Sequence, residues 1–375
     1  MRSALALGVA AGYAADAAFG DPRRGHPVAG FGRAATALEQ RIWRDHRGTG
    51  AAFTALCVGT VAVGAVAAER AVRGSGAGRV LLAGAATWTV LGGASLVREA
   101  RTVGRALEAG DLAAARERLP YLCGRDPREL TEQQLARAVV ESVAENTADA
   151  VVNALVWGAL AGVPGLLAFR AVNTLDAMVG HRSPRLLRFG WASARLDDVA
   201  GWPGARVTAL LTVAAAEPAR RADAWRVWRR DAAGHPSPNA GQAEAAFAGA
   251  LGVRLGGTLR YADSAERGDA LGGGAAERGG ALAGGERVAG GAAEPGDSLG
   301  GDAAERGGGE LSVGGRVEHR AVLGGEGRPV AVADIERACL LSRRVGLLAA
   351  GAAVAVAMAG ASGLLGFSSN RRGRR

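Results

Sequence analysis

The sequence predicts an all-α, polytopic integral membrane protein with about four to six membrane-embedded helical segments and helical loops on the cytoplasmic side. Half of its 375 residues are apolar (49%), but only 5% are aromatic, and 59 residues are Gly. Small residues let helix backbones approach closely in lipid, whereas a soluble core would contain more large apolar side chains. The net charge is +9 and every basic residue is Arg. Arg-rich loops beside apolar segments are typical of the cytoplasmic side of a membrane.

Four segments are apolar enough to enter a bilayer: residues 4–19, 51–68, 80–97 and 345–367. The second and third are predicted to form an antiparallel hairpin, because each would span about 27 Å as a helix and a short loop joins them. The first contains one interior acid, Asp16, and a cleaved signal peptide is the alternative interpretation of that segment.

A fifth apolar segment, Val151 to Val172, is interrupted by Val163-Pro164-Gly165 and flanked by the similar motifs N-T-A-D and N-T-L-D. Pro and Gly break a helix unless a turn is intended. We predict a re-entrant helical hairpin with its tip near Pro164, which places both polar motifs on the same side of the membrane. A kinked span that separates the motifs is the alternative. A further segment, Ala205 to Ala216, is too short to cross and is expected at the interface or inside the bundle.

The chain is predicted to have three parts: residues 1–261 and 318–375 as the first and last parts of a membrane-embedded catalytic domain with a basic tail, and 262–317 as a Gly-rich insert. The insert contains a duplication, since D-A-L-G-G-G-A-A-E-R-G-G at 269–280 recurs as D-S-L-G-G-D-A-A-E-R-G-G at 297–308. It is too poor in apolar residues to fold and is expected to be disordered. A phosphate-binding glycine loop is excluded, because no strand precedes the segment and no G-K-[ST] motif follows it.

Polar residues gather in four islands beside the apolar segments, where polar groups are costly unless they serve a function. The first island, G-D-P-R-R-G-H-P at 20–27, contains Asp21 and His26. Its charge density beside an apolar segment favours a binding function. A loop that only ends a helix is the alternative.

The second island contains Asn146 and three carboxylates, Glu141, Glu145 and Asp149. The carboxylates lie at i, i+4 and i+8 on one helical face, where like charges are destabilising unless a cation binds them. Carboxylates together with substrate phosphates are typical ligands of Mg²⁺, so Glu145 and Asp149 are the candidate magnesium ligands. A solvated face or a helix cap is the alternative.

The third and fourth islands combine Asn, Asp and Arg side chains with a turn-forming motif. Arg side chains can fork onto phosphate or carboxylate. A helix that begins at S-P-N-A-G would offer free N–H groups to an anion, and a capped amphipathic helix is the alternative. The candidates in the third island are Asn173, Asp176, Arg182, Arg195 and Asp197, and those in the fourth are Ser237, Asn239 and Glu244.

Several classes of chemistry are excluded. The chain has no Lys, so a P-loop lysine, a Schiff base and a Lys general base are impossible. Its three Cys residues are scattered and indicate neither a disulfide framework nor a zinc site. No basic stripe with interleaved aromatic residues suggests a nucleic-acid partner. What remains is a membrane protein whose acidic, Asn-rich and Arg-rich site suits phosphate-bearing substrates with Mg²⁺.

Six motifs together give the chain a close resemblance to adenosylcobinamide-phosphate synthase, a membrane protein family of cobalamin biosynthesis. They occur in the order G-D-P-R-R-x-H-P-V, E-S-x-A-E-N-T-x-D, R-A-V-N-T-L-D-x-M-V-G, F-G-W-A-S-A-R-L-D-D, S-P-N-A-G-x-x-E-A-x-x-A-G-A-L-G-V-R-L-G-G and R-P-V-x-V-x-D-I-x-R-A. The resemblance runs from about Asp16 to the last apolar segment. It implies ATP-dependent amide-bond formation between a carboxylate of adenosylcobyric acid and aminopropanol or its phosphate, which gives adenosylcobinamide or its phosphate. ATP and Mg²⁺ then act as substrate and activator, and the corrinoid is a substrate rather than a cofactor.

If the chain catalyses this reaction, roles for the islands follow as hypotheses that the family name itself does not assign. Catalytic and metal-binding roles fall to Glu145, Asp149, Asp176 and Asp197; phosphate clamping falls to Arg182 and Arg195; substrate binding falls to Asp21, His26, Asn146, Asn173, Ser237, Asn239 and Glu244. The implied location is a bacterial cell membrane, crossed several times, with the active site on the cytoplasmic side. Lipid and other enzymes of the corrinoid pathway are the implied partners.

The sequence departs from the family pattern at a few positions. Gln242 and Ala243 follow S-P-N-A-G where the family usually has an aromatic residue and Pro, and His181 stands where Tyr is usual. These departures bear on the preference for the amino alcohol. Two functions of other classes stay open, a membrane transporter and a non-catalytic scaffold of a corrinoid-assembly complex. Polar islands at the segment ends and the lack of a visible inverted repeat argue against the transporter.

Overall fold

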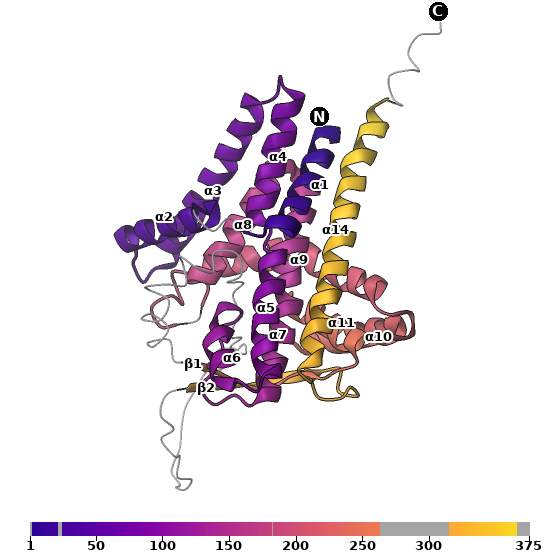
Figure 1. Ribbon diagram of the computed structural model, residues 1–375. Helices are drawn as coiled ribbons and strands as arrows, with labels where there is room; N and C mark the ends of the chain where they lie inside the picture. Colours follow the sequence, from indigo (N-terminus) through magenta and orange to yellow (C-terminus); the bar gives the residue numbers. More distant parts are fainter. Residues whose placement is uncertain (1, 22–24, 182, 263–314, 366–375) are drawn as a thin grey trace, which may run out of the picture.

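The computed structural model of the protein describes residues 2–21, 25–181, 183–262 and 315–365. The main helices are α1 (Arg2–Phe19), α2 (Pro27–Ile42), α3 (Arg47–Ala71), α4 (Gly76–Val90), α5 (Gly93–Glu108), α6 (Leu112–Arg118), α7 (Glu132–Thr147), α8 (Asn153–Val179), α9 (Trp191–Ala215), α10 (Arg221–Asp231), α11 (Ala240–Leu251) and α14 (Ala333–Leu365), and the strands are β1 (Leu255–Ala262) and β2 (Gly315–Leu323). Figure 1 shows the N-terminus of α1, the α3–α4 turn and the end of α14 together at the upper end of the molecule. Helices α6, α10 and α11 and the two strands lie at the lower end.

The expected all-α polytopic membrane architecture is confirmed. Within the described part of the chain, four helical stretches are long and apolar enough to cross a membrane, and α1 is a shorter apolar helix beside them. These four stretches are Arg47–Ala71, Gly76–Glu108, Glu132–Val179 and Ala333–Ala359. The last helix begins at Ala333, twelve residues before the predicted start at Val345, because the polar turns of α14 pack on the lower helices instead of forming a loop.

The predicted span at residues 80–97 lies within the apolar stretch Gly76–Glu108, but the helix is interrupted inside it. Helix α4 ends at Val90, α5 begins at Gly93, and Leu91 is extended. The N–H of Gly92 donates to the carbonyl of Ala150, 3.2 Å away on the neighbouring polar segment. The break therefore joins the membrane-embedded α4 to the amphipathic α5, whose apolar face is buried at the lower end.

Small residues bring α1 against α4. A Cβ atom built on Gly8 would lie 2.4 Å from the Cβ of Ala83, and one built on Gly12 would lie 2.5 Å from the Cβ of Thr87. Only Gly permits this approach, as in the small-residue contacts of membrane helices. The segment that a signal peptide would occupy is thus a packed helix of the bundle, in contact with α4 and α14.

Helix α8 reverses direction inside its span. Ala161 and Gly162 leave the helical region, with φ +65° at Gly162. A Cβ built on Gly165 would lie 2.6 Å from the carbonyl oxygen of Trp157, whereas eight residues of straight helix extend about 12 Å. The chain therefore turns back on itself, as the predicted helical hairpin requires. The alternative, a kinked helix that crosses in one direction, is not observed. Glu69 of α3 accepts a hydrogen bond from the N–H of Val163 (3.2 Å) and so caps the second arm.

Helix α9 contains the short segment that the sequence places at the interface or in the bundle. Ala205, Thr208 and Ala209 are fully buried, so the bundle interior is the correct alternative. The helix is longer than expected, since its first residues are those of the F-G-W-A-S-A-R-L-D-D motif.

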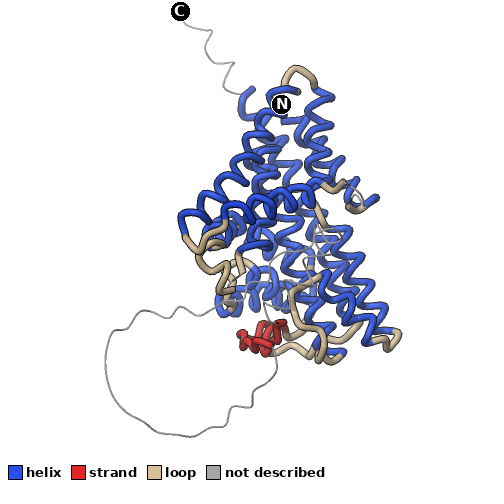
Figure 2. Tube along the Cα trace, turned by 90° about the vertical axis from the view of Figure 1, so that its left-hand side faces the viewer, coloured by secondary structure: helices blue, strands red, loops and turns tan. Residues whose placement is uncertain are grey.

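The antiparallel ribbon of β1 and β2 was not expected from the sequence. Leu255 pairs with Leu323 at one end and Ala262 pairs with Gly315 at the other. Figure 2 shows the ribbon (red) at the lower end of the helical body. The ribbon flanks the Gly-rich insert, whose residues 263–314 lie outside the described residues. Gly256 and Gly257 have φ values of +78° and +82°, which favour Gly. A pair of glycines in the sequence does not predict a strand, so the ribbon could not be expected.

Candidate functional site

The two arms of the α8 hairpin bring the second and third islands together beside the first island. Arg170, on the second arm, is buried and lies within electrostatic range of Asp21 in the first loop and of Asp149 before the first arm. Asp149 also lies 3.5 Å, through Oδ1, from the Nδ2 of Asn153. One guanidinium thus stands among carboxylates from two separate islands. Arg170 belongs to the R-A-V-N-T-L-D motif, but no role was predicted for it from the sequence.

His26 belongs to the same cluster. Its Nδ1 accepts a hydrogen bond from the N–H of Val28 (3.2 Å) and caps α2, while its buried Nε2 has no hydrogen-bond partner within the described residues. Burial lowers the pKa of His26, nearby Arg170 lowers it further, and Asp21 acts in the opposite direction. A ring that is neutral at pH 7 can accept a hydrogen bond or a proton from a ligand.

The face of three carboxylates is compensated by arginines. Glu141 is buried, forms an ion pair with buried Arg125, and accepts a hydrogen bond from the N–H of Gly256 at 2.6 Å. It therefore fixes the ribbon to α7. Asp149 stands instead in a π-helical turn, Ala148–Val152, and has Arg170 as its positive neighbour. Such turns inside α-helices are frequent at functional sites. The inference that like charges require a metal is corrected for Glu141, because guanidinium groups supply the positive charge.

Glu145 and Asn146 lie in the last turn of α7. Glu145 is buried, and Asn146 donates from Nδ2 to the carbonyl of Ser142 at 3.0 Å. The Oδ1 of Asn146 is buried and has no hydrogen-bond partner among the described residues. Within that same part of the chain, no group of three His, Cys, Asp or Glu side chains is arranged to bind a metal. Magnesium commonly takes one or two carboxylates plus substrate phosphates, so the oxygen donors of Glu145, Asn146 and Asp149 suit it chemically.

The third island joins α8 to α9. Asn173 donates from Nδ2 to Oδ1 of Asp197 at 3.4 Å, and both side chains are buried. Asp176 is buried, and its backbone carbonyl accepts from the N–H of Gly180 at 2.7 Å. Arg195 is exposed on α9. Its side chain is therefore accessible to a phosphate group from solvent. Arg182 lies outside the described residues.

The fourth island is more enclosed than expected. Ser237 Oγ accepts hydrogen bonds from the N–H groups of Asn239 (3.3 Å) and Ala240 (3.1 Å). The helix N-terminus is therefore capped by the chain itself, which corrects the expectation that its N–H groups are free for an anion. Asn239 donates to the carbonyl of Asp198 at 2.9 Å and accepts from Arg206 at 3.1 Å, so it ties α11 to α9.

Glu244 lies in a buried cluster that the sequence did not reveal. Its Oε1 is 3.5 Å from Nε2 of His235, and Arg320 Nη1 is 3.2 Å from the same nitrogen. Burial, with the charge of Arg320, lowers the pKa of His235 to about 4. The residues come from α11, the turn before it and β2, so only the folded ribbon brings them together. Glu244 thus belongs to this buried cluster, and its role in substrate binding stays a prediction.

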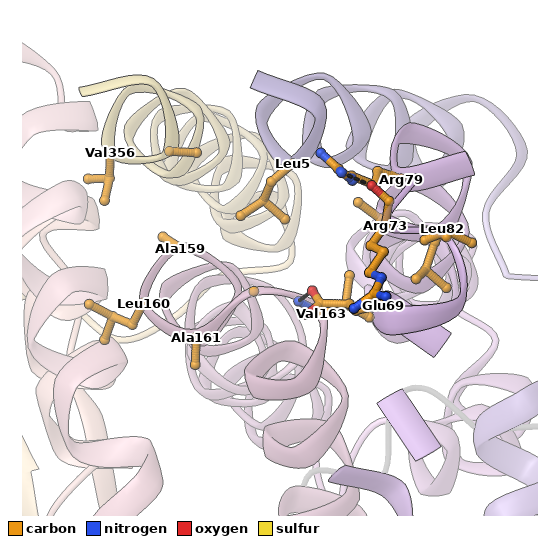
Figure 3. Close-up of a pocket in the computed structure, with 14 residues that line it drawn as sticks. Leu5, Glu69, Arg73, Arg79, Leu82, Ala159, Leu160, Ala161, Val163 and Val356 are labelled. Atoms are coloured by element: carbon orange, nitrogen blue, oxygen red, sulfur yellow. Dashed lines mark hydrogen bonds between the residues drawn. The ribbon is translucent and has the colours of Figure 1, made fainter. Parts of the chain in front are cut away.

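A cavity of about 450 Å³ lies at the upper end, away from the polar islands. Figure 3 shows its two sides, with Glu69, Arg73 and Arg79 on one and the apolar Leu160 and Val356 on the other. The residues at the tip of the α8 hairpin line part of this cavity. Among the described residues, none that the sequence assigned to substrate, phosphate or metal lines it.

Comparison with known proteins gives consistent matches. The family described as CobD/Cbib protein matches residues 9–281. "Cobalamin biosynthesis protein CobD" of Mycobacterium tuberculosis is 54% identical over 271 residues, which cover 72% of this chain and 86% of that protein. Proteins of the same name are 46% identical in Geobacter metallireducens (66% and 80% covered) and 42% identical in Chromobacterium violaceum (70% and 84% covered). No solved structure matches.

Proposed function

The chain belongs to the CobD/Cbib protein family and has a role in cobalamin biosynthesis, and from this premise we propose that it catalyses ATP-dependent amide-bond formation. The proposed substrates are adenosylcobyric acid and aminopropanol or aminopropanol phosphate. The product is adenosylcobinamide or its phosphate. One observation carries the proposal: buried Arg170 lies within electrostatic range of the carboxylates of Asp21 and Asp149, so that three polar islands come together.

The proposed reaction has two steps. The γ-phosphoryl group of ATP passes to the substrate carboxylate, so that an acyl phosphate forms and ADP leaves. The amine nitrogen then attacks the acyl carbon, the C–N bond forms, the C–O bond to phosphate breaks, and the amine gives up a proton. Mg²⁺, when bound with ATP, would neutralise phosphate charge during the first step.

The residues of the chain divide these tasks by position. Arg170 is placed to stabilise negative charge that develops on the transferring phosphoryl group or on the acyl oxygen, because it is fixed and screened from water. Exposed Arg195 can close on the nucleotide phosphates. The carboxylates of Asp149, Asp176 and Asp197 are the candidates for the base that takes the amine proton.

The proposed location of the reaction is the cytoplasmic side of a cell membrane. The lower end holds the Arg-rich helices α5, α6 and α10, and positive loops favour the cytoplasmic side. ATP is also supplied from there. An impermeant thiol reagent applied to cysteines introduced near Asp149 and near Asp176 is expected to label both from the cytoplasmic face.

The hairpin of α8 favours one second candidate, a membrane transporter. Broken helices with polar residues at their ends are typical of transporter binding sites. Catalysis and transport predict different behaviour of the purified protein. In detergent, the enzyme should form corrinoid amide and hydrolyse ATP only when corrinoid, amine and Mg²⁺ are all present. Product should be followed by mass spectrometry with each component omitted in turn. ATP hydrolysis without amide, or no amide under any mixture, would reject the proposed reaction.

A further inference from the structure

A second cavity, of about 160 Å³, lies next to the polar islands. It is enclosed by α1, the start of α5, the π turn and α14, and Asp16, Tyr13, Arg101, Val151, Ser342 and Arg343 line it. Its volume far exceeds the ~15 Å³ that one water requires, so the cavity can admit a small organic molecule. Ser342 Oγ lies 2.6 Å from Oγ1 of Thr147, in the E-N-T-A-D motif. The cavity therefore adjoins the candidate active site.

Asp16 is the acidic end of the cavity. Its side chain is 3% exposed, and its Oδ2 accepts a hydrogen bond from the N–H of Ala94 at 3.2 Å, at the N-terminus of α5. The other oxygen, Oδ1, is buried and has no hydrogen-bond partner in the described chain. A buried carboxylate oxygen without a partner is costly, and a ligand with a positively charged N–H group would satisfy it. Asp16 lies within electrostatic range of Asp21, so this end of the cavity faces the candidate active site.

Two guanidinium groups form the basic end. Arg101 is already held by Glu336, through Nε to Oε2 at 2.8 Å and Nη2 to Oε1 at 2.6 Å. Arg343, two turns beyond Glu336 on α14, is exposed and has no ion pair within the described residues. Tyr13 also lines the cavity and lies within electrostatic range of both Asp16 and Arg343.

We propose that this cavity binds the amino alcohol phosphate, with the ammonium group on Asp16 Oδ1 and the phosphate on Arg343. The inference rests on the proposed function, because that function supplies the substrate class. The charge order of the cavity matches a small molecule with a cationic amine at one end and an anionic phosphate at the other. The arrangement places the amine at the end nearest Asp21 and Arg170, where the activated carboxylate would arrive.

The test uses the full-length protein in phosphate-free detergent buffer, without ATP or corrinoid. Aminopropanol phosphate should raise the melting temperature, and aminopropanol or inorganic phosphate should raise it less at equal concentration. Arg343→Gln should weaken the apparent binding of aminopropanol phosphate by about tenfold or more, because one charge-assisted contact is lost. Arg344→Gln is the matched control, since this neighbour lies on the same helix but lines a different cavity.

Steady-state kinetics then distinguish the basic end of the cavity from its acidic end. Arg343→Gln should raise the KM for aminopropanol phosphate and leave the KM for aminopropanol unchanged. Asp16→Asn keeps an acceptor for Ala94 and should raise the KM for both amines without changing that for the corrinoid. Equal effects of Arg343→Gln and Arg344→Gln, or no stabilisation of the unsubstituted protein by aminopropanol phosphate, would overturn the assignment. Specific binding without any amide product would refute the proposed reaction and leave this site standing.

Discussion

Replacing Glu141 by Gln is expected to destabilise the protein because it removes a negative charge. The size and shape of the side chain stay nearly the same. The side chains of Glu141 and Arg125 are each 2% exposed and form an ion pair. Gln can still accept the hydrogen bond from Gly256, but it removes the negative charge that faces the buried guanidinium of Arg125. Breaking one partner of a buried ion pair costs about 3–5 kcal/mol. We expect the lower end of this range, because the chief hydrogen bond to the ribbon survives.

A double-mutant cycle isolates the ion pair. Glu141→Gln and Arg125→Met are each expected to cost about 3 kcal/mol, and the double variant should cost at least ~1 kcal/mol less than their sum. The free energy of unfolding is measured in mixed detergent micelles by Trp fluorescence. Glu132→Gln is the matched control, because this carboxylate is exposed on the first turn of α7, where a change should stay within about 0.5 kcal/mol.

The same variants separate structure from chemistry. Glu141→Gln should retain its activity per folded molecule, because the carboxylate is occupied by Arg125 and Gly256. Strict additivity of the two single changes would show that the pair contributes no coupling. Normal stability together with lost activity would place Glu141 among the catalytic carboxylates and would refute this reasoning.

Three further outcomes are expected. Asp149→Asn should keep normal expression but lower turnover tenfold or more, roughly 1.4 kcal/mol of transition-state stabilisation, and raise the Mg²⁺ requirement; an unchanged rate across a Mg²⁺ titration would contradict this. Because the folded pKa of His235 is about 4, below its value of about 6.5 when unfolded, the neutral ring contributes stability above pH 6.5 that is lost towards pH 4, up to about 3 kcal/mol. Unfolding measured from pH 7 to 4 should be less pH-dependent in His235→Asn, and equal slopes would exclude this role. Replacing residues 263–314 by Asn-Gly should preserve accumulation and activity, because Ala262 and Gly315 are paired and a two-residue turn can close them; failure to accumulate in membranes would count against it.

Local patterns were sufficient to predict several parts of the fold. The apolar segments predicted the membrane helices, because hydropathy and length are properties of consecutive residues. Pro164 and its neighbouring glycines predicted the turn of α8, because these residues limit the backbone wherever they stand. The polar islands Asp21, Asp149 and Asn173 were likewise visible as costly groups beside apolar segments.

The tertiary structure alone decided which charges meet. Arg125 forms an ion pair with Glu141, Arg170 lies within electrostatic range of Asp21 and Asp149, and Arg320 of β2 reaches His235. No periodicity encodes these interactions, because each depends on how separate segments of the chain pack together. The ribbon escaped prediction for the same reason, since its strands lie on either side of the Gly-rich insert and pair only with each other. The sequence by itself determined a membrane protein with a charged site and its family resemblance. The packing determined which charged side chains from separate islands lie together, because such contacts depend on the whole fold.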